Sequence, residues 1–317
     1  MYKCKICNNI DNNVAFEATE MMFGYRDKFI YFQCAGCKSL QIAEIPQNMS
    51  KYYSNTYYSL LDNQSISPLC VLRGKLRDKY ALFKKGLIGR LLCLIYPPNE
   101  CLKYLPQFGL DSDSKILDVG CGSGGFLYAL HQLGFKDLTG VDPYIETDMR
   151  YGDGIKILKR DIHSLDDKWD LIILNHSFEH MPDPSEAFQS IRNILSKNGS
   201  CLIRIPIVPS YAWEHYGVNW VQLDAPRHFF LHSIKGIKIL SNKVNLRLER
   251  VIYDSTDFQF WGSEQYLKDI PYMSEKSYAS NRRKSMFNSR RIAEFKRLAK
   301  ELNRNEQGDQ VAIILRK

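Results

Sequence analysis

Short apolar runs, bounded by polar or glycine residues, follow one another through the last two thirds of the chain. Their length is that of strands, and most are apolar on both faces, as in strands buried in a parallel sheet. They span residues 116–119, 138–141, 154–159, 169–175, 200–206, 248–253 and 310–316. Helical patterns separate most of them, at residues 126–130, 184–195, 234–240 and 284–303. This alternation predicts an α/β fold with a doubly wound, mostly parallel sheet.

A longer amphipathic pattern precedes the first of these strands. Its apolar positions recur at spacings of three and four, and basic residues fill the other face. These positions are Leu72, Leu76, Tyr80, Phe83, Leu87, Leu91 and Leu94. The pattern predicts one helix, ended by Pro97 and Pro98, that three glycines weaken. We favour a helix packed on the fold and keep a helix lying on a membrane surface as the alternative.

The first apolar run leads into a glycine-rich turn. Gly120, Gly122 and Gly124 alternate after Val119, and a helical pattern starts at Phe126. Glycines at such a turn let the backbone bend tightly and approach a ligand closely. A purely structural turn and a dinucleotide-binding fold are the alternatives for this segment.

Two acids distinguish this turn from a dinucleotide site. Asp118 stands before the first glycine, where a carboxylate suits a cationic ligand better than a pyrophosphate. Asp142 ends the next predicted strand, in a position to accept both hydroxyls of a ribose.

From these residues on, the chain resembles the class I S-adenosylmethionine-dependent methyltransferases. The stretch ILDVGCGSGG resembles their first motif, GVDP their second, and WDLIILN followed by HSFEHMPDP their fourth strand and its loop. The resemblance covers roughly residues 100–317 and implies a Rossmann-like sheet of seven strands, the last antiparallel. It implies S-adenosylmethionine as cofactor, with Asp161 on the adenine amino group and the backbone of Ile162 on the ring. The cofactor residues expected from the resemblance are Asp118, Gly120, Cys121, Gly122, Gly124, Asp142, Pro143, Asp161, Ile162, Asn175 and His176.

Two Cys-x-x-Cys pairs stand near the start of the chain. Cys4 and Cys7 form the first pair, and Cys34 and Cys37 form the second. Two such pairs can complete a closed tetrahedral Zn²⁺ site, which is structural rather than catalytic. We therefore expect three parts: a zinc ribbon over residues 1–48, a linker and helical cap over residues 49–110, and a methyltransferase domain over residues 111–317. The linker contains a tyrosine-rich row, including Tyr57 and Tyr58, that packs the connection or stacks on a base or sugar.

Two polar, aromatic segments follow the fifth and sixth predicted strands, at residues 211–228 and 254–266. We expect both to cross the carboxyl edge of the sheet, where the methyl acceptor binds. His228 and His180 are the candidate general bases, and structural histidines are the alternative. Arg227, next to Asp224, is the candidate clamp for a phosphate or carboxylate of the substrate.

The loop after the fourth strand also allows a metal site. His176, Glu179 and His180, together with His228, resemble the catalytic magnesium set of the small-RNA terminal 2′-O-methyltransferases. That family has a glutamate where His176 stands, and further histidines after its fifth strand.

The distribution of charge indicates the kind of binding partner, and the cysteine content indicates the cellular compartment. The 317-residue chain has a formal net charge of +8. Residues 71–90 hold seven basic side chains against one acid, and residues 281–300 hold eight against one. These stretches suit sugar nucleotides, nucleic acid or a membrane surface, or they are solvated helix faces. Nine cysteines, four of them in metal-type pairs, and no signal-peptide or transmembrane pattern lead us to expect a reducing cytoplasm.

These observations predict an enzyme that methylates a small anionic or glycosyl acceptor, most simply a hydroxyl of a sugar in polysaccharide biosynthesis. Zinc-ribbon methyltransferases of this layout include sugar C-methyltransferases. The alternative is an RNA methyltransferase acting on a ribosomal-RNA base or a 2′-hydroxyl. Against it, the Asn/Asp-Pro-Pro-Tyr/Phe signature of nucleic-acid N6-methyltransferases does not follow the fourth strand. A third class, an adaptor that keeps only cofactor binding, is disfavoured because the motifs are intact.

Overall fold

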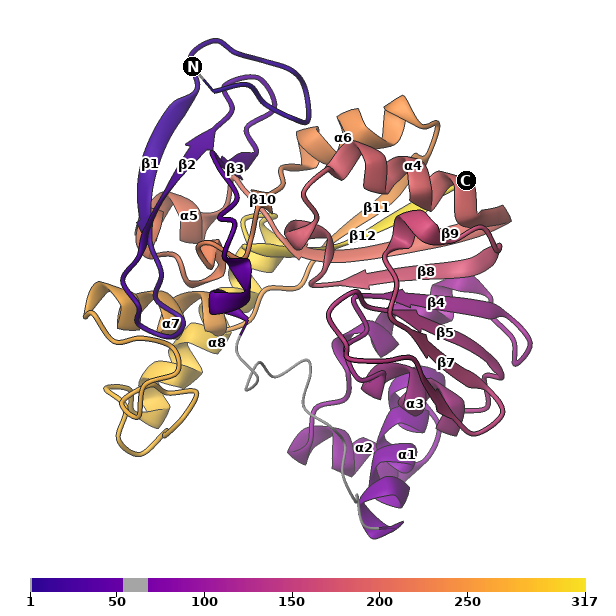
Figure 1. Cartoon of the computed structure of the whole chain (residues 1–317). Helices are drawn as coiled ribbons and strands as arrows, with labels where there is room; N and C mark the ends of the chain where they lie inside the picture. Colours follow the sequence, from indigo (N-terminus) through magenta and orange to yellow (C-terminus); the bar gives the residue numbers. More distant parts are fainter. Residues whose placement is uncertain (1, 54–67) are drawn as a thin grey trace. The chain divides into compact units, whose positions relative to one another are not determined.

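Figure 1 shows the computed structural model of the chain, which describes residues 2–53 and 68–317. The predicted linker tyrosines Tyr57 and Tyr58 lie outside the described residues. The chain divides into two compact units. The first unit comprises Met1–Ser54, His176–Phe188 and Ile203–Leu315, and the second comprises Asn55–Asn175, Gln189–Leu202 and Arg316–Lys317. The three predicted domains, residues 1–48, 49–110 and 111–317, do not coincide with these two units, and this division of the chain stays a prediction.

The second unit contains a mainly parallel set of strands. They are β4 (Lys115–Val119), β5 (Asp137–Val141), β6 (Met149–Tyr151), β7 (Ile155–Leu158) and β8 (Trp169–Asn175). The pairs β4–β5, β4–β8 and β5–β7 are parallel, while β6 runs antiparallel to β7. The short connection between β5 and β7 contains β6 and no helix. Ile116, Leu117 and Ile172 are fully buried, as the apolar runs predict.

The turn between β4 and α3 (Gly125–Gln132) requires its glycines. Gly120, Gly122 and Gly124 all have positive φ, at 76°, 53° and 80°. Gly124 precedes the first residue of α3, and a Cβ built on it would lie 2.6 Å from Cδ1 of Ile157 in β7. A side chain there meets both backbone strain and a steric clash.

The predicted single helix before β4 is two helices, so that expectation is corrected. α1 (Pro68–Phe83) and α2 (Leu87–Ile95) are separated by a turn in which Gly86 has a φ of 101°. A 3₁₀ segment, η3 (Glu100–Phe108), follows. The apolar periodicity continues across the break, which is why the sequence pattern did not reveal it.

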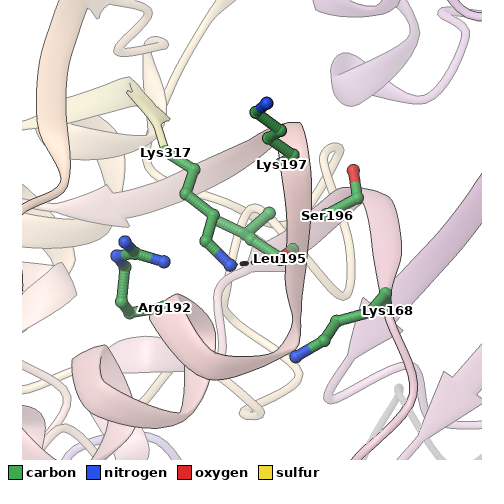
Figure 2. Close-up of a pocket in the computed structure, with 6 residues that line it drawn as sticks. All are labelled: Lys168, Arg192, Leu195, Ser196, Lys197 and Lys317. Carbon is green, nitrogen blue, oxygen red and sulfur yellow. Dashed lines mark hydrogen bonds between the residues drawn. The ribbon is translucent and has the colours of Figure 1, made fainter.

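A hollow of about 500 Å³ lies at the end of α4 (Pro184–Ile194). Figure 2 shows its lining, in which Lys317 donates a hydrogen bond to the carbonyl oxygen of Leu195 at 2.6 Å. Lys168, the residue before β8, donates to the carbonyl oxygen of Asn193. Cations at a helix C-terminus satisfy its last carbonyl groups and complement its dipole. The hollow therefore has a structural explanation, and it lies where β8 starts, not where ligands of such sheets bind.

The first unit holds a four-stranded antiparallel sheet with the order β1-β2-β3-β10. Its strands are β1 (Val14–Thr19), β2 (Lys28–Gln33), β3 (Leu40–Ile42) and β10 (Phe230–Leu231). The first two form the indigo hairpin in Figure 1. The expected ribbon is thus present, and its sheet is completed by a strand from the second half of the chain.

The remaining elements complete the larger sheet and its helices. They are β9 (Leu195–Pro206), α5 (Tyr211–Tyr216), α6 (Ile234–Lys243), β11 (Arg247–Tyr253), α7 (Phe258–Leu267), α8 (Ser289–Arg304) and β12 (Gln310–Arg316). The larger sheet has the strand order β11-β12-β9-β8-β4-β5-β7-β6. The predicted α/β fold with a mostly parallel sheet is confirmed. No helix among residues 2–53 and 68–317 is long and apolar enough to cross a membrane.

The two aromatic segments form helices instead of open loops. Trp213, Trp220 and Trp261 are buried, with exposures of 7%, 0% and 9%. Nε1 of Trp220 donates a hydrogen bond to the buried carboxylate of Asp309 at 2.9 Å. These three tryptophan rings pack the interior of the first unit. Because the indole of Trp220 finds a buried partner, the polar and aromatic character of its segment did not require a place on the surface.

Gly124→Ala should lower the free energy of unfolding by about 1–3 kcal/mol, because alanine in the left-handed region is strained and its Cβ meets Ile157. Gly74→Ala is the matched control, since Gly74 lies in α1 and a Cβ there has nothing within 4 Å. The control should stabilise by up to about 1 kcal/mol. Urea denaturation checks both, and equal effects of the two variants would contradict the packing seen at Gly124.

Candidate functional site

Backbone hydrogen bonds fix the glycine turn against the end of β5. The amides of Gly120 and Cys121 donate to the carbonyl oxygen of Val141 at 2.8 and 3.3 Å. The amide of Gly122 donates to Oδ2 of Asp142 at 2.9 Å, and the amide of Tyr144 donates to Oδ1 at 2.9 Å. Each carboxylate oxygen of Asp142 keeps a further lone pair, so two hydroxyls of a ribose can still be accepted.

Asp118 is the second acid at this turn. Burial raises the pKa of its carboxyl group to about 7, and the negative charge of Asp142 adds to the effect. A buried carboxylate of this kind is ionised at a cost, which a cationic ligand nearby would remove. The geometry is thus consistent with the cation-facing role that the sequence suggested for Asp118.

The other predicted cofactor residues of the second unit follow the carboxyl ends of its strands. Pro143 is exposed after β5, Asp161 is exposed after β7, and Asn175 ends β8. Oδ1 of Asp161 accepts the amide of Ser164 at 3.0 Å, and Ile162 beside it is buried. Burial also raises the pKa of the Cys121 thiol. The second unit therefore supplies ten of the eleven predicted residues, all but His176.

In the first unit, two histidines and a glutamate form a cluster. Glu179 and His180 belong to the 3₁₀ segment η5 (Phe178–His180), and the rings of His180 and His228 lie 4.8 Å apart. The ligand atoms of the three side chains all lie within 4.8 Å of one another. Nε2 of His228 lies 4.0 Å from Oε1 of Glu179 and 3.8 Å from Oδ2 of Asp224.

Backbone carbonyl groups set the tautomers of both histidines. Nδ1 of His228 lies 2.8 Å from the carbonyl oxygen of Gln222, and Nδ1 of His180 lies 2.8 Å from that of Arg227. A carbonyl oxygen only accepts, so each Nδ1 carries a hydrogen, and in the neutral form of either ring the lone pair is on Nε2. Burial and the charge of His228 lower the pKa of His180 to about 4, so His180 is neutral near pH 7.

Glu179 is fully buried beneath these rings. Its burial raises its pKa, but the hydrogen bond from His176 and the neighbouring histidines outweigh that and lower the pKa to about 2. Its Oε2 has no hydrogen-bond partner among the residues that the structure describes. Glu179 therefore presents a negative charge to the histidines while lying out of reach of solvent.

Both ring nitrogens of His176 are engaged. Nη1 of Arg204 donates to Nε2 at 2.9 Å, so Nδ1 carries the hydrogen and donates to Glu179 at 3.2 Å. Nε of Arg204 also donates to the buried carboxylate of Asp254 at 2.6 Å. His176 and Asp224 have positive φ of 53° and 44°, a backbone strain that often accompanies functional sites. We therefore assign His176 to positioning Glu179, and the metal alternative rests on three residues instead of four.

Arg227 is wholly buried, which argues against its predicted role as a substrate clamp. Its guanidinium donates to both carboxylate oxygens of Asp224, with Nε at 2.9 Å from Oδ2. Nη1 donates to the carbonyl oxygen of Tyr52 at 3.2 Å and lies 3.6 Å from Oε1 of Glu20. Glu20 in turn accepts the amides of three successive residues after β1. The side chain thus holds Asp224 in place, and burial, which opposes ionisation of Asp224, is outweighed by Arg227, so the pKa of Asp224 is lowered.

Sequence reasoning missed several members of this network. Arg204 interrupts the apolar run that begins at Cys201 in β9, and a charge in a buried strand signals a partner. Tyr53, whose hydroxyl lies 3.1 Å from Nδ1 of His180, belongs to the tyrosine-rich row assigned to the linker. Glu20 and Asp254 carry no local signal, because their partners come from distant parts of the chain.

The four cysteines of the two pairs converge in the first unit. Sγ of Cys4 lies 3.6 Å from Sγ of Cys37, and Sγ of Cys7 lies 3.5 Å from Sγ of Cys34. All four sulfur atoms lie within 4.8 Å of one another. Four sulfurs at about 2.3 Å from one tetrahedral Zn²⁺ are separated by about 3.8 Å, so the spacing fits such an ion. Nε2 of Gln41 donates to Sγ of Cys4 at 2.8 Å, as donors around thiolate ligands do.

The strand, the glycine turn and the acid ending the second strand define a nucleotide-binding α/β protein. Residues 95–251 match the family model described as a methyltransferase domain, so the chain contains such a domain. The class predicted from the motifs, an S-adenosylmethionine-dependent methyltransferase, is confirmed. A comparison with curated proteins gave no match.

Solved structures similar to this chain include two described as methyltransferases and one described as a cyclopropane synthase. One is a putative sarcosine dimethylglycine methyltransferase from Galdieria sulphuraria, with 14% identity, 77% of this chain and 98% of that chain covered, and a TM-score of 0.46. Another is an S-adenosylmethionine-dependent methyltransferase from Archaeoglobus fulgidus, with 19% identity, coverage of 72% and 99%, and a TM-score of 0.43. A third is the cyclopropane synthase MmaA2 from Mycobacterium tuberculosis, with 16% identity, coverage of 66% and 80%, and a TM-score of 0.42.

The raised pKa of Asp118 predicts how cofactor affinity depends on pH. Because a cationic ligand prefers the ionised carboxylate, S-adenosylmethionine should bind more weakly as the pH falls below about 7, by up to about tenfold per unit. Without ligand, burial in the folded protein favours the protonated carboxyl group of Asp118. The folding stability that this group contributes at low pH is therefore lost as the pH rises through about 7. Calorimetry between pH 5 and 8 measures the affinity.

Asp118→Asn should weaken binding at pH 8 and flatten the pH dependence. Asp113→Asn is the matched control, because Asp113 is an exposed acid of the same unit. A pH dependence that survives in Asp118→Asn would place the titrating group elsewhere.

Proposed function

We propose that the protein transfers a methyl group from S-adenosylmethionine to a hydroxyl group of a small glycosyl acceptor. The observation that carries the proposal is the environment of Nε2 of His228. This lone pair faces two carboxylates, those of Asp224 and Glu179, both within 4.0 Å. A proton taken from a hydroxyl would be stabilised there by both negative charges, as a general base requires.

His180 is the second candidate for the base. Its Nε2 also carries a lone pair, and its side chain is more accessible than that of His228. Its pKa of about 4 makes it a weaker base than an ordinary histidine. We therefore place His228 first, as the sequence analysis did, and give His180 the role of an accessible neighbour that orients the acceptor hydroxyl.

The residues of the second unit would hold the cofactor. Asp142 would accept the ribose hydroxyls, Asp161 would bind the adenine amino group, and Asp118 would face the cationic part of the ligand. When bound, the sulfonium supplies an electrophilic methyl group, so the protein needs only to orient the acceptor and remove its proton. The backbone amides of the glycine turn already have partners at Val141 and Asp142, which keeps the turn rigid before binding.

The charges around the histidines narrow the acceptor. Glu179 and Asp224 are acidic, and Arg227 is already neutralised by Asp224 and Glu20. A phosphate or carboxylate placed against His228 would be repelled, whereas a sugar hydroxyl would be accepted. Of the two classes that the sequence suggested, the glycosyl acceptor is therefore favoured, and any anionic group of it would bind away from the histidines.

We also propose that the four cysteines hold one structural Zn²⁺. The spacing of the sulfur atoms and the burial of Cys4, Cys34 and Cys37 support a closed site without an open position for substrate. The ion would tie the start of the chain to the segment before β3.

His228→Asn should lower turnover by roughly 10²–10⁴-fold while cofactor affinity is unchanged. Asparagine keeps a donor for the carbonyl oxygen of Gln222 and removes the basic nitrogen. Turnover is measured as transfer of a labelled methyl group to a panel of nucleotide-linked sugars, with ribosomal RNA as the competing acceptor. His215→Asn, on an exposed histidine of the same unit, is the control and should keep full activity.

Three results would contradict this assignment. Label found in RNA would favour the alternative function, and label on a carbon atom would replace O-methylation by C-methylation. If His180→Asn alone abolished transfer, and the wild-type rate fell only near pH 4, His180 would be the base, because a base must be unprotonated to act.

Elemental analysis of the purified chain should find one zinc per molecule. Cys34→Ser should lose the metal and unfold the ribbon sheet, while the second unit still binds S-adenosylmethionine. Cys70→Ser, at an exposed cysteine outside the cluster, should keep the metal. A metal-free protein with an intact ribbon would refute the zinc site.

A further inference from the structure

The helix α2 presents a row of large apolar side chains to solvent. Leu87, Leu91 and Leu94 are 79%, 62% and 78% exposed, and Ile88 and Ile95 are 64% and 67% exposed. Positions i, i+4 and i+7 share one side of a helix, so these residues form a continuous face. Among the residues that the structure describes, no other helix exposes five such side chains in a row of nine.

Packing of α2 on α1 explains which side is exposed. Gly89 is the buried residue of α2, and a Cβ built on it would lie 2.3 Å from the carbonyl oxygen of Leu76 and 2.6 Å from Cβ of Tyr80. The glycine therefore lets the two helices approach closely. The exposed face of α2 lies on the side of the helix opposite this contact, so its leucines and isoleucines are not part of the α1–α2 packing.

The hairpin that carries the apolar face also carries exposed cations. Exposed basic side chains occur on α1, in the turn and on α2, and they are Arg73, Lys75, Lys79, Lys84, Lys85 and Arg90. The one acid of this stretch, Asp78, is buried and accepts two hydrogen bonds from Arg77. The hairpin thus joins an uncovered apolar face to uncompensated positive charge.

We propose that the α1–α2 hairpin docks the enzyme on the surface of an anionic lipid bilayer. The leucines and isoleucines of α2 enter the boundary between headgroups and acyl chains, and the lysines of the turn meet the anionic headgroups. A helix of nine residues is far too short to span the hydrocarbon core, so the contact is peripheral.

Charge distinguishes this occupant from a second copy of the chain. A second copy packed over α2 would bring the exposed cations of one hairpin, such as Lys84, Lys85 and Arg90, towards the equally basic hairpin of the other copy. Like charges facing each other across an interface cost several kcal/mol, and no acid of the hairpin lies nearby to compensate. An anionic lipid surface supplies both the apolar layer and the negative charge that the face lacks.

Cosedimentation of the full-length chain with vesicles tests the proposal. Vesicles of phosphatidylcholine with 30% phosphatidylglycerol, about one anionic lipid in three, should bind the protein at low salt, and pure phosphatidylcholine vesicles should bind at least tenfold more weakly. Leu91→Glu combined with Leu94→Glu should reduce binding to the anionic vesicles at least tenfold. Both side chains are exposed, so the fold and the affinity for S-adenosylmethionine should not change.

A matched pair of variants separates this face from general positive charge. Lys296→Glu combined with Lys300→Glu reverses two exposed cations of α8, the other strongly basic helix, and should leave vesicle binding unchanged. If the α8 variant lost as much vesicle binding as the α2 variant, the binding would be due to diffuse electrostatic attraction and not to docking through α2. No binding to anionic vesicles, or a dimer in solution that Leu91→Glu dissociates, would overturn the proposal.

Discussion

The buried guanidinium of Arg227 is the interaction on which the histidine cluster depends. It joins the carboxylate of Asp224, the carboxylate of Glu20 and the carbonyl oxygen of Tyr52, which come from three separate parts of the first unit. The carbonyl oxygen of Arg227 itself accepts the hydrogen of His180, so the same residue fixes a histidine tautomer. Removing the cation would leave the buried carboxylate of Glu20 and the half-buried carboxylate of Asp224 without their shared counter-ion, a loss on the order of 3–5 kcal/mol.

This arrangement would let a charged residue support the proposed site without touching substrate. Asp224 is held by Arg227 and lies 3.8 Å from Nε2 of His228, so the guanidinium acts on the histidine through the carboxylate. On the other side, Glu179 is held by His176, which is held in turn by Arg204. Each carboxylate near the proposed base therefore has its own buried support, and neither needs to be reoriented when a proton arrives.

The sequence predicted the features that local physics decides. The strands of the second unit follow from short apolar runs, and the turn at Gly120 to Gly124 follows from the need for positive φ. The convergence of the four cysteines follows from the spacing of the two pairs. The role of Arg227 could not be read in the same way, because its burial depends on Glu20, which is distant in the sequence. The same holds for Trp220, whose burial depends on Asp309 near the last strand.

The one long periodic pattern failed for a related reason. A period of 3.6 predicts that apolar residues share a face, but not that another element covers that face. On α1 the predicted face is half-buried at Leu76 and Tyr80 and exposed at Leu72 and Phe83, whereas on α2 its leucines are all exposed. The break at Gly86 turns α2 back on α1, so one glycine, Gly89, makes the contact that a row of leucines was expected to make. The leucines of α2 that make no contact with α1 are therefore exposed. Together with the exposed lysines and arginines of the same hairpin, they determine which partner this surface can bind.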